Sequence, residues 1–260
     1  MTRLLRHLEE RRSGGRKLLV PYLMGGAPDE AGFLAAAGEA ARHADAVEIG
    51  LPYSDPLMDG PVIVDAGERA LRSGTGPVAA LEMSAAAPED PPRVVMTYYN
   101  PIHMLGEVEF CRRAAKCGAT GLIVPDLPLE ESRSLRRAAA EEDLAWIPLV
   151  APTTSEARTA ELAATATGFV YAVSTLGVTG ERSALSARAA AVATRCKAAT
   201  DAPVLVGIGV STPAQAREAA GPADGVVIGS AVVRLVLEEG AAAAGGFLAS
   251  VRAALDSRPG

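Results

Sequence analysis

Short apolar segments recur along the chain, and most of them show little alternation between polar and apolar positions. Strands with this pattern are buried on both faces, as in a parallel sheet that is covered by helices. Eight segments fit the description: residues 18–24, 46–50, 94–98, 121–124, 146–150, 169–173, 204–207 and 225–228. The sequence therefore predicts eight buried strands.

The stretches between these strands predict helices, because small apolar residues recur in them at helical spacing. They cover residues 29–43, 107–117, 129–142, 155–166, 183–198, 213–220 and 231–237. Pro213 follows a Ser-Thr pair, and proline suits the first turn of a helix. Two more helices, over residues 2–12 and 246–255, precede the first strand and follow the last one.

Eight strand–helix units in about 240 residues predict a single α/β domain over residues 1–260, a (β/α)8 TIM barrel with an extra N-terminal helix. The main alternative is a doubly wound sheet, which often carries a Gly-x-Gly-x-x-Gly turn after its first strand. The turn after the first predicted strand, Met-Gly-Gly-Ala-Pro at residues 24–28, lacks that spacing. Catalytic residues of barrels lie at the C-terminal ends of strands, so candidate residues are sought there.

Composition excludes several classes of protein. The chain has 25 Lys plus Arg and 31 Asp plus Glu, and a net charge of −6 argues against nucleic-acid binding. No apolar run approaches the ~20 residues of a membrane helix, and the charged N-terminus lacks the apolar core of a signal peptide. Three cysteines cannot form a disulfide framework, so we expect a cytoplasmic protein.

Two acidic residues follow the second predicted strand. Glu48 lies inside that apolar strand, and burial there would raise its pKa enough for proton exchange near neutral pH. The next loop holds Asp55, Asp59 and three prolines, which stiffen it. From these residues alone, Glu48 could equally be a structural carboxylate, and Asp59 could be a turn residue before Gly60.

A longer motif surrounds the two acids. Residues 48–61 read Glu-x-Gly-x-Pro-x-Ser-Asp-Pro-x-x-Asp-Gly-Pro, which resembles the signature of the tryptophan synthase alpha subunit family. Further similar segments lie within or directly after the predicted strands, in order along the chain, at residues 20–22, 97–101, 125–131, 151–154, 177–180, 207–211 and 229–230. The resemblance covers nearly the whole chain.

The resemblance implies a carbon–carbon lyase that cleaves indole-3-glycerol phosphate to indole and glyceraldehyde 3-phosphate by a retro-aldol step. Glu48 matches the catalytic glutamate of the family, and Asp59 matches its catalytic aspartate. A glutamate with a pKa near the working pH can give one proton and take another. A carboxylate at the indole N–H can stabilise the positive charge of the protonated ring. This acid–base scheme requires no cofactor and no metal.

Glycines follow the last three predicted strands and indicate a phosphate site. TIM barrels often bind phosphate at this place through backbone N–H groups and a helix N-terminus. The candidates are Gly180, Gly209, Gly229 and Ser230. Each glycine could instead serve only a tight turn. Thr179 matches a threonine of the family's lid, although the preceding Ser-Thr-Leu-Gly run lacks the arginine that many members have after the serine.

The resemblance also predicts an apolar pocket for the indole ring. Its lining would be Tyr22, Met96, Tyr98, Ile123, Tyr171, Ile208 and Val227. Each of these residues alone could equally belong to the core of a barrel. Asp55, Pro56 and Asn100 match the partner-facing surface of the family, which implies a beta subunit in an α2β2 heterotetramer. Pyridoxal phosphate would belong to that beta subunit.

Other reaction classes fit the sequence less well. The chain has only Lys17, Lys116 and Lys197, none near the C-terminal end of a predicted strand, which disfavours a Schiff-base aldolase. The three histidines are far apart in sequence and do not have metal-ligand spacing. A stand-alone lyase that releases free indole, a phosphosugar isomerase and a non-catalytic regulatory subunit remain alternatives. The intact pair of Glu48 and Asp59 argues against the regulatory subunit.

Overall fold

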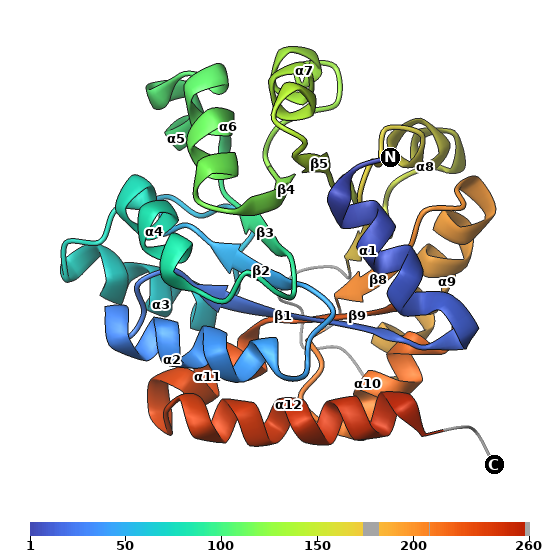
Figure 1. Cartoon of the computed structure of the whole chain (residues 1–260). Coiled ribbons are helices and arrows are strands. Elements are labelled where there is room, and N and C mark those ends of the chain that lie inside the picture. Colours follow the sequence, from blue (N-terminus) through green and yellow to red (C-terminus); the bar gives the residue numbers. More distant parts are fainter. Residues whose placement is uncertain (174–181, 208, 258–260) are drawn as a thin grey trace.

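The computed structural model describes residues 1–173, 182–207 and 209–257, and its strands form one curled parallel sheet (Figure 1). The strands are hydrogen-bonded in the order β5-β4-β3-β2-β1-β9-β8-β7-β6. Their bounds are β1 (Leu18–Met24), β2 (Val47–Gly50), β3 (Arg93–Met96), β4 (Ala119–Ile123), β5 (Ala145–Trp146), β6 (Leu149–Val150), β7 (Val170–Val173), β8 (Val204–Gly207) and β9 (Gly225–Ile228).

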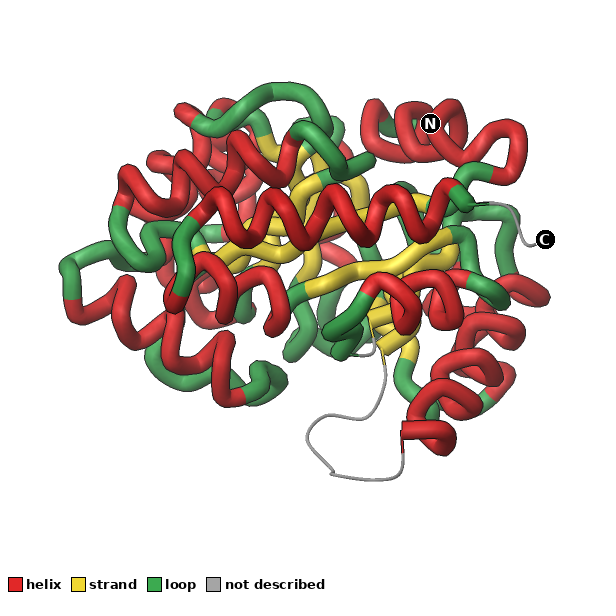
Figure 2. The backbone as a smooth tube through the Cα atoms, turned by 90° about the horizontal axis from the view of Figure 1, so that it is seen from below, coloured by secondary structure: helices red, strands yellow, loops and turns green. Residues whose placement is uncertain are grey.

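Helices surround the strands, as the view from below shows (Figure 2). They are α1 (Arg3–Arg12), α2 (Glu30–Ala41), α3 (Pro61–Arg72), α4 (Pro77–Met83), α5 (Tyr99–Leu105), α6 (Glu107–Lys116), α7 (Arg133–Glu141), α8 (Glu156–Ala163), α9 (Arg182–Ala199), α10 (Pro213–Ala220), α11 (Ser230–Glu238) and α12 (Ala241–Asp256), with two short 3-10 turns, η1 (Ser13–Gly15) and η2 (Ser84–Ala86). This is TIM-barrel architecture, so the predicted fold class and the extra N-terminal helix are confirmed.

The fifth predicted strand is split in the structure. β5 pairs with β4, β6 pairs with β7, and Ile147 and Pro148 connect the two short strands. The Ile147 N–H donates to the Leu122 carbonyl of β4 (3.1 Å), and the Pro148 carbonyl accepts from the Tyr171 N–H of β7 (3.0 Å). Proline has no N–H to donate, which interrupts regular pairing. The described residues thus contain nine strands rather than eight, but residues 145–150 still bridge β4 and β7 in the barrel wall.

The extra helix α1 fills the N-terminal end of the barrel. Leu4 and Leu8 are fully buried and pack in one cluster with Leu18 at the start of β1 and Phe169 directly before β7. A Cβ on Gly121 of β4 would lie 2.9 Å from a terminal methyl carbon of Leu4, so glycine leaves room for the leucine. The base of the barrel is therefore packed with apolar side chains.

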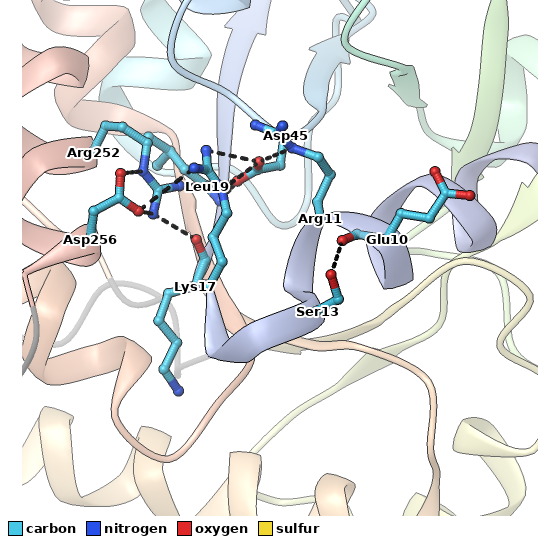
Figure 3. A network of polar contacts seen from close by, with 9 residues as sticks. Glu10, Arg11, Ser13, Lys17, Leu19, Asp45, Arg252 and Asp256 are labelled. Atoms are coloured by element: carbon cyan, nitrogen blue, oxygen red, sulfur yellow. Dashed lines mark hydrogen bonds and ion pairs between the residues drawn. The ribbon is translucent and has the colours of Figure 1, made fainter.

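A buried carboxylate fastens α1 and α12 to this end of the barrel. Asp45 is fully buried and accepts from Arg11 Nε (2.9 Å), from Arg252 Nη1 (3.1 Å) and from the Leu19 N–H (2.9 Å) (Figure 3). Arg252 also donates to Asp256 (2.6 Å) within α12. The network joins the first and last helices to the start of the sheet.

Three helices were not predicted, namely α3, α4 and α5. Pro61 and Pro77 stand in the first turns of α3 and α4, a helix signal that the sequence did contain. The predicted C-terminal helix over residues 246–255 begins earlier, as α12. Among the described residues, the structure has no helix that is both long and apolar enough to cross a membrane.

Candidate active site

Glu48 occupies the second position of β2, with buried neighbours on both adjacent strands. It is in register with Tyr22 of β1 and with Val94 of β3, and only 3% of its surface is exposed. Val94 packs in the apolar cluster at the base of the barrel, which includes Leu4 and Phe169. The side chain of Glu48 therefore lies on an apolar floor.

The surroundings of Glu48 favour its protonated form. Burial raises the pKa of Glu48 to about 8, and the nearby charge of Asp59 adds to the rise. Its buried Oε2 atom has no hydrogen-bond partner among the described residues. A carboxyl group without such a partner retains its capacity to exchange a proton with a bound molecule.

Asp59 lies in the loop between β2 and α3, directly before Gly60, the N-cap residue of α3. Burial raises the pKa of Asp59, and a hydrogen bond from the Tyr98 hydroxyl opposes that rise. The same hydroxyl accepts the Met58 N–H (2.9 Å). Asp59 thus keeps more anionic character than Glu48, and the two carboxyl groups have environments suited to different roles.

Tyr98 has a second role besides its predicted place in the lining of an apolar pocket. It follows β3, is 2% exposed, and holds the loop of Asp59 through the hydrogen bonds to Met58 and Asp59. The ring of Tyr53 from the same loop lies against it, with ring centroids 5.3 Å apart. The motif gave no sign of this contact, because Tyr98 lies about 40 residues from the loop that it holds.

Most of the predicted pocket residues lie at the C-terminal half of the barrel interior. Tyr22, Tyr98, Ile123 and Val227 are buried, Met96 and Tyr171 are partly exposed, and Ile208 lies outside the described residues. Burial and the charges of both carboxyl groups raise the pKa of Tyr22 and of Tyr171. The charges of the same two carboxyl groups therefore act on both phenols.

Two glycines at strand ends make room for these phenol rings. A Cβ on Gly50 would lie 1.8 Å from the Tyr22 hydroxyl, and a Cβ on Gly207 would lie 2.6 Å from a ring carbon of Tyr171. Each ring therefore lies directly over a glycine of a neighbouring strand. Neither glycine was a predicted site residue, because sequence spacing does not show which side chain crosses a strand end.

The structure describes only some of the residues predicted to bind the phosphate group. Gly229 is the N-cap residue of α11, which has no side-chain cap, and Ser230 is exposed at its first position. The first N–H groups of a helix have no partner within that helix, so they are available to an anion. A Cβ on Gly229 would lie 3.7 Å from Tyr22 Cβ, which puts this helix start beside the pocket.

Gly209 adopts a φ of +65°, a conformation that favours glycine, and it is exposed after β8. Gly180 and Thr179, the other predicted phosphate and lid residues, lie outside the described residues. The structure thus brings Gly229 and Ser230 beside the pocket, shows Gly209 at the neighbouring strand end, and leaves two predicted residues without a description.

Apolar side chains are exposed near the residues predicted to face a partner. Asp55 and Asn100 are exposed and Pro56 is partly exposed. In the same loop and on the neighbouring helices, large apolar side chains are mostly exposed: Leu57 (77%), Met104 (78%) and Val108 (65%). Exposed apolar groups of this kind are typical of surfaces that contact another protein.

No group of three or more His, Cys, Asp or Glu side chains in the described residues could hold a metal ion. The lysines lie away from the acidic pair. Lys17 directly precedes β1, Lys116 ends α6, and Lys197 of α9 pairs with Asp224 (2.8 Å). None of them is at the C-terminal end of a strand, as the sequence predicted.

The sequence is similar over most of its length to proteins of one family. A family model described as tryptophan synthase alpha chain matches residues 8–252. The tryptophan synthase alpha chain of Carboxydothermus hydrogenoformans is 46% identical over 239 residues, which are 91% of this chain and 90% of the relative. That of Streptomyces coelicolor is 45% identical over 245 residues, 93% of this chain and 90% of the relative.

Solved structures are similar over almost their whole length. A structure of Mycobacterium tuberculosis tryptophan synthase has a TM-score of 0.89 at 40% identity and covers 99% of each chain. Tryptophan synthase subunit alpha from Legionella pneumophila has a TM-score of 0.89 at 32% identity, over 98% of this chain and 99% of that chain.

Proposed function

The chain belongs to the tryptophan synthase alpha chain family, and from that premise we propose how its residues perform the lyase reaction. The reaction is the cleavage of indole-3-glycerol phosphate to indole and glyceraldehyde 3-phosphate. In the proposed mechanism Glu48 exchanges protons with the substrate and Asp59 stabilises the charge that develops on the indole ring. The observation that carries it is the buried Glu48 with a pKa of about 8 beside Asp59.

The first step is protonation of indole C3. At neutral pH Glu48 is mostly protonated, because its pKa is about 8. It gives its proton to C3, which becomes tetrahedral, and the ring nitrogen takes on positive charge. Asp59, which the Tyr98 hydroxyl keeps closer to its ordinary pKa, accepts the indole N–H and stabilises that charge.

The second step breaks the carbon–carbon bond. The carboxylate of Glu48 takes the proton of the hydroxyl group on the carbon attached to C3. The electron pair of the broken bond returns to the ring, which neutralises the nitrogen and restores indole. The oxygen forms the aldehyde of glyceraldehyde 3-phosphate, and Glu48 ends protonated, ready for another turnover. The scheme uses no cofactor and no metal ion.

We assign substrate binding to the two ends of the same pocket. The indole ring lies among Tyr22, Met96, Tyr98, Ile123, Tyr171, Ile208 and Val227. The phosphate lies at Gly180, Gly209, Gly229 and Ser230, where the start of α11 supplies N–H groups. Thr179 belongs to the proposed lid. The position of Gly229, where an added Cβ would lie 3.7 Å from Tyr22 Cβ, supports a single continuous substrate site.

A beta subunit is the proposed partner, in an α2β2 assembly with pyridoxal phosphate on the beta subunit. Asp55, Pro56 and Asn100 would face it, and the exposed Leu57 and Met104 nearby support this surface. The similar M. tuberculosis structure is of a tryptophan synthase. Residues 1–260 are proposed to form one domain, supported by the single continuous sheet. Three free, buried cysteines support a reducing, cytoplasmic location.

The test is an assay of indole release from indole-3-glycerol phosphate, with and without added beta subunit. Glu48→Gln should lower kcat by about 1,000-fold or more while KM changes little, because the proton exchange is lost and the pocket stays intact. Near-normal turnover in this variant would contradict the mechanism. Strong stimulation by the beta subunit supports the synthase, whereas full activity alone would indicate a stand-alone lyase.

A further inference from the structure

A small cavity lies at the N-terminal end of the barrel, opposite to the active site. It has a volume of about 170 Å³, large enough for several waters or a small oxyanion. Its walls come from α1, from the segments that precede β1, β2 and β3, and from α12. Nothing in the proposed lyase mechanism uses this cavity.

Hydrogen-bond donors dominate the walls. Four arginines and two histidines line the cavity, against one carboxylate: they are His7, Arg11, Arg16, Arg42, His43 and Arg252, with Asp90. Each guanidinium carries five N–H donors and accepts nothing. The lining therefore offers many more donors than acceptors.

The carboxylate behind the cavity already has its full set of donors. Asp45 accepts from Arg11, Arg252 and Leu19, as Figure 3 shows, and also from Arg16 Nε (3.3 Å). A carboxylate has about four acceptor positions, so Asp45 has none left for the remaining donors. Arg11 uses only its Nε atom in these contacts, and its side chain is 43% exposed.

The structural network explains Arg252 but not the two imidazoles. Arg252 is occupied by Asp45, Asp256 and the Lys17 carbonyl. The buried Nε2 atom of His7 has no hydrogen-bond partner in the described part of the chain. A buried polar atom without a partner costs free energy, so the network that accounts for Arg252 does not account for His7.

We propose that this cavity is a second anion site, which binds a phosphate-type oxyanion between the imidazoles of His7 and His43 and the guanidinium groups of Arg11, Arg16 and Arg42. An oxyanion supplies the acceptors that the lining lacks, and hydrogen bonds between charged donors and phosphate oxygens are the stronger kind. Arg42 is paired with Glu39 (3.0 Å) but is 69% exposed, so it can also reach an anion at the mouth. Asp90, which is exposed, opposes binding by its charge, and Asp256, 3.8 Å from Arg16 Nη1, competes with an anion for that guanidinium.

The three histidines of the chain allow a direct test. His7 and His43 line the cavity, whereas His103 lies on α5 against the ring of Tyr99 and serves as the internal control. Inorganic phosphate is titrated into the whole protein while the imidazole NMR signals are followed, with chloride at matched ionic strength as the reference. The signals of His7 and His43 should shift in a saturable way, and that of His103 should not.

Two exposed positions give matched variants. Arg42→Gln should raise the Kd for phosphate about 5-fold to 10-fold, and Asp90→Asn should lower it, because one removes a cation and the other an anion. The same histidine shifts should persist in Ser230→Asp, which places a negative charge at the proposed substrate phosphate site. This variant separates the cavity from the active site, so failure of either proposal can be recognised on its own.

A second titration with glycerol 3-phosphate distinguishes a free oxyanion from a phosphate ester. Shifts with both compounds assign the site to phosphate esters as well, and shifts with inorganic phosphate alone assign it to the free ion. The proposal is overturned if chloride causes the same shifts, if all three histidines shift together, or if Arg42→Gln and Asp90→Asn leave the titration unchanged.

Discussion

At the scale of single residues, Glu48 illustrates how a barrel makes a proton donor from an ordinary carboxyl group. The apolar floor raises its pKa, and Asp59 raises it further, while Tyr98 partly protects Asp59 from the same effect. Two carboxyl groups with different environments are a common way to divide acid and charge-stabilising roles. An ionised Glu48 is poorly solvated in the folded protein, so its ionisation costs folding stability.

That cost leads to a prediction about stability. Burial raises the pKa of Glu48 from about 4.5 to about 8, so the folded state holds a proton that the unfolded chain releases between these pH values. The wild-type protein should lose stability across this window, by at most about 1.4 kcal/mol per pH unit. Glu48→Gln cannot ionise, so its stability advantage should grow from pH 5 to pH 8 and then level off.

Urea denaturation of both proteins at several pH values measures this difference in the free energy of unfolding. The control is Glu68→Gln, which removes a carboxylate on the exposed face of α3. A fully buried acid such as Asp45 is unsuitable, because its substitution would disturb the core. A Glu48→Gln advantage that does not change with pH would contradict the raised pKa.

Tyr98 carries a second prediction at this scale. Tyr98→Phe removes the hydroxyl that accepts from Met58 and donates to Asp59, so the loop loosens and the pKa of Asp59 rises. Because a hydrogen bond to a charged group contributes about 1.5–3 kcal/mol, kcat/KM should fall about 10-fold to 100-fold.

Tyr53→Phe is the matched control for Tyr98→Phe, since the Tyr53 ring packs on Tyr98 and its hydroxyl makes no hydrogen bond to the described residues. Activity is measured as indole release over a range of pH. Both variants keep the aromatic rings, so equal losses would show that the effect is not specific to the Tyr98 hydroxyl.

At the scale of elements, the strand predictions succeeded where burial is uniform and failed where one residue changed the hydrogen bonding. The run over residues 146–150 looks like one strand, but Pro148 interrupts it and leaves β5 and β6. The two short strands still connect β4 with β7 through backbone hydrogen bonds. The sheet therefore closes despite the interruption.

The start of α11 gives a prediction at this scale. Ser230→Asp places a carboxylate at the first position of α11, where it stabilises the helix but repels a phosphate group. KM for indole-3-glycerol phosphate should rise about 10-fold or more, while the thermal midpoint stays the same or rises. Ser230→Ala, which adds no charge, should have a smaller effect. An unchanged KM in Ser230→Asp would place the phosphate elsewhere.

At the scale of the whole molecule, the two ends of the barrel have different tasks. The C-terminal ends of the strands carry the acidic pair and the pocket, whereas the N-terminal end is filled by Leu4 and Leu8 and fastened by Asp45. This division is general for TIM barrels, in which the N-terminal face mainly provides stability. The proposed anion site would give that face a further task.

The fastening by Asp45 predicts a large loss of stability. Asp45→Asn leaves Arg252, with a side chain that is 10% exposed, without one of its two carboxylate partners. Breaking a buried ion pair of this kind costs about 3–5 kcal/mol. The urea midpoint should fall accordingly, while kcat and KM of the folded protein stay near wild type at low temperature. A variant as stable as the wild type would show that the network is dispensable.

The exposed apolar residues predict how a partner binds. Met104→Asp on α5 should weaken binding of the beta subunit about 10-fold, because a charge would be desolvated at the interface, and should leave the basal lyase activity unchanged. Arg72→Ser, at an exposed position near the end of α3, is the control. Titration of the stimulation of indole release measures the affinity. Equal affinity of both variants would place the partner on another surface.

The fold class, the family and the choice of Glu48 and Asp59 as candidates all follow from the amino-acid sequence. Buried parallel strands leave a continuous apolar pattern, and residues 48–61 keep both acids within one short motif, so this information is local in the chain. The environment of those two acids, in contrast, depends on how the chain folds. The apolar floor beneath Glu48, the hydroxyl of Tyr98 at Asp59 and the basic cavity at the opposite end all join residues that are distant in sequence. A pKa depends on what surrounds a group in space, and the order of residues along the chain does not specify it.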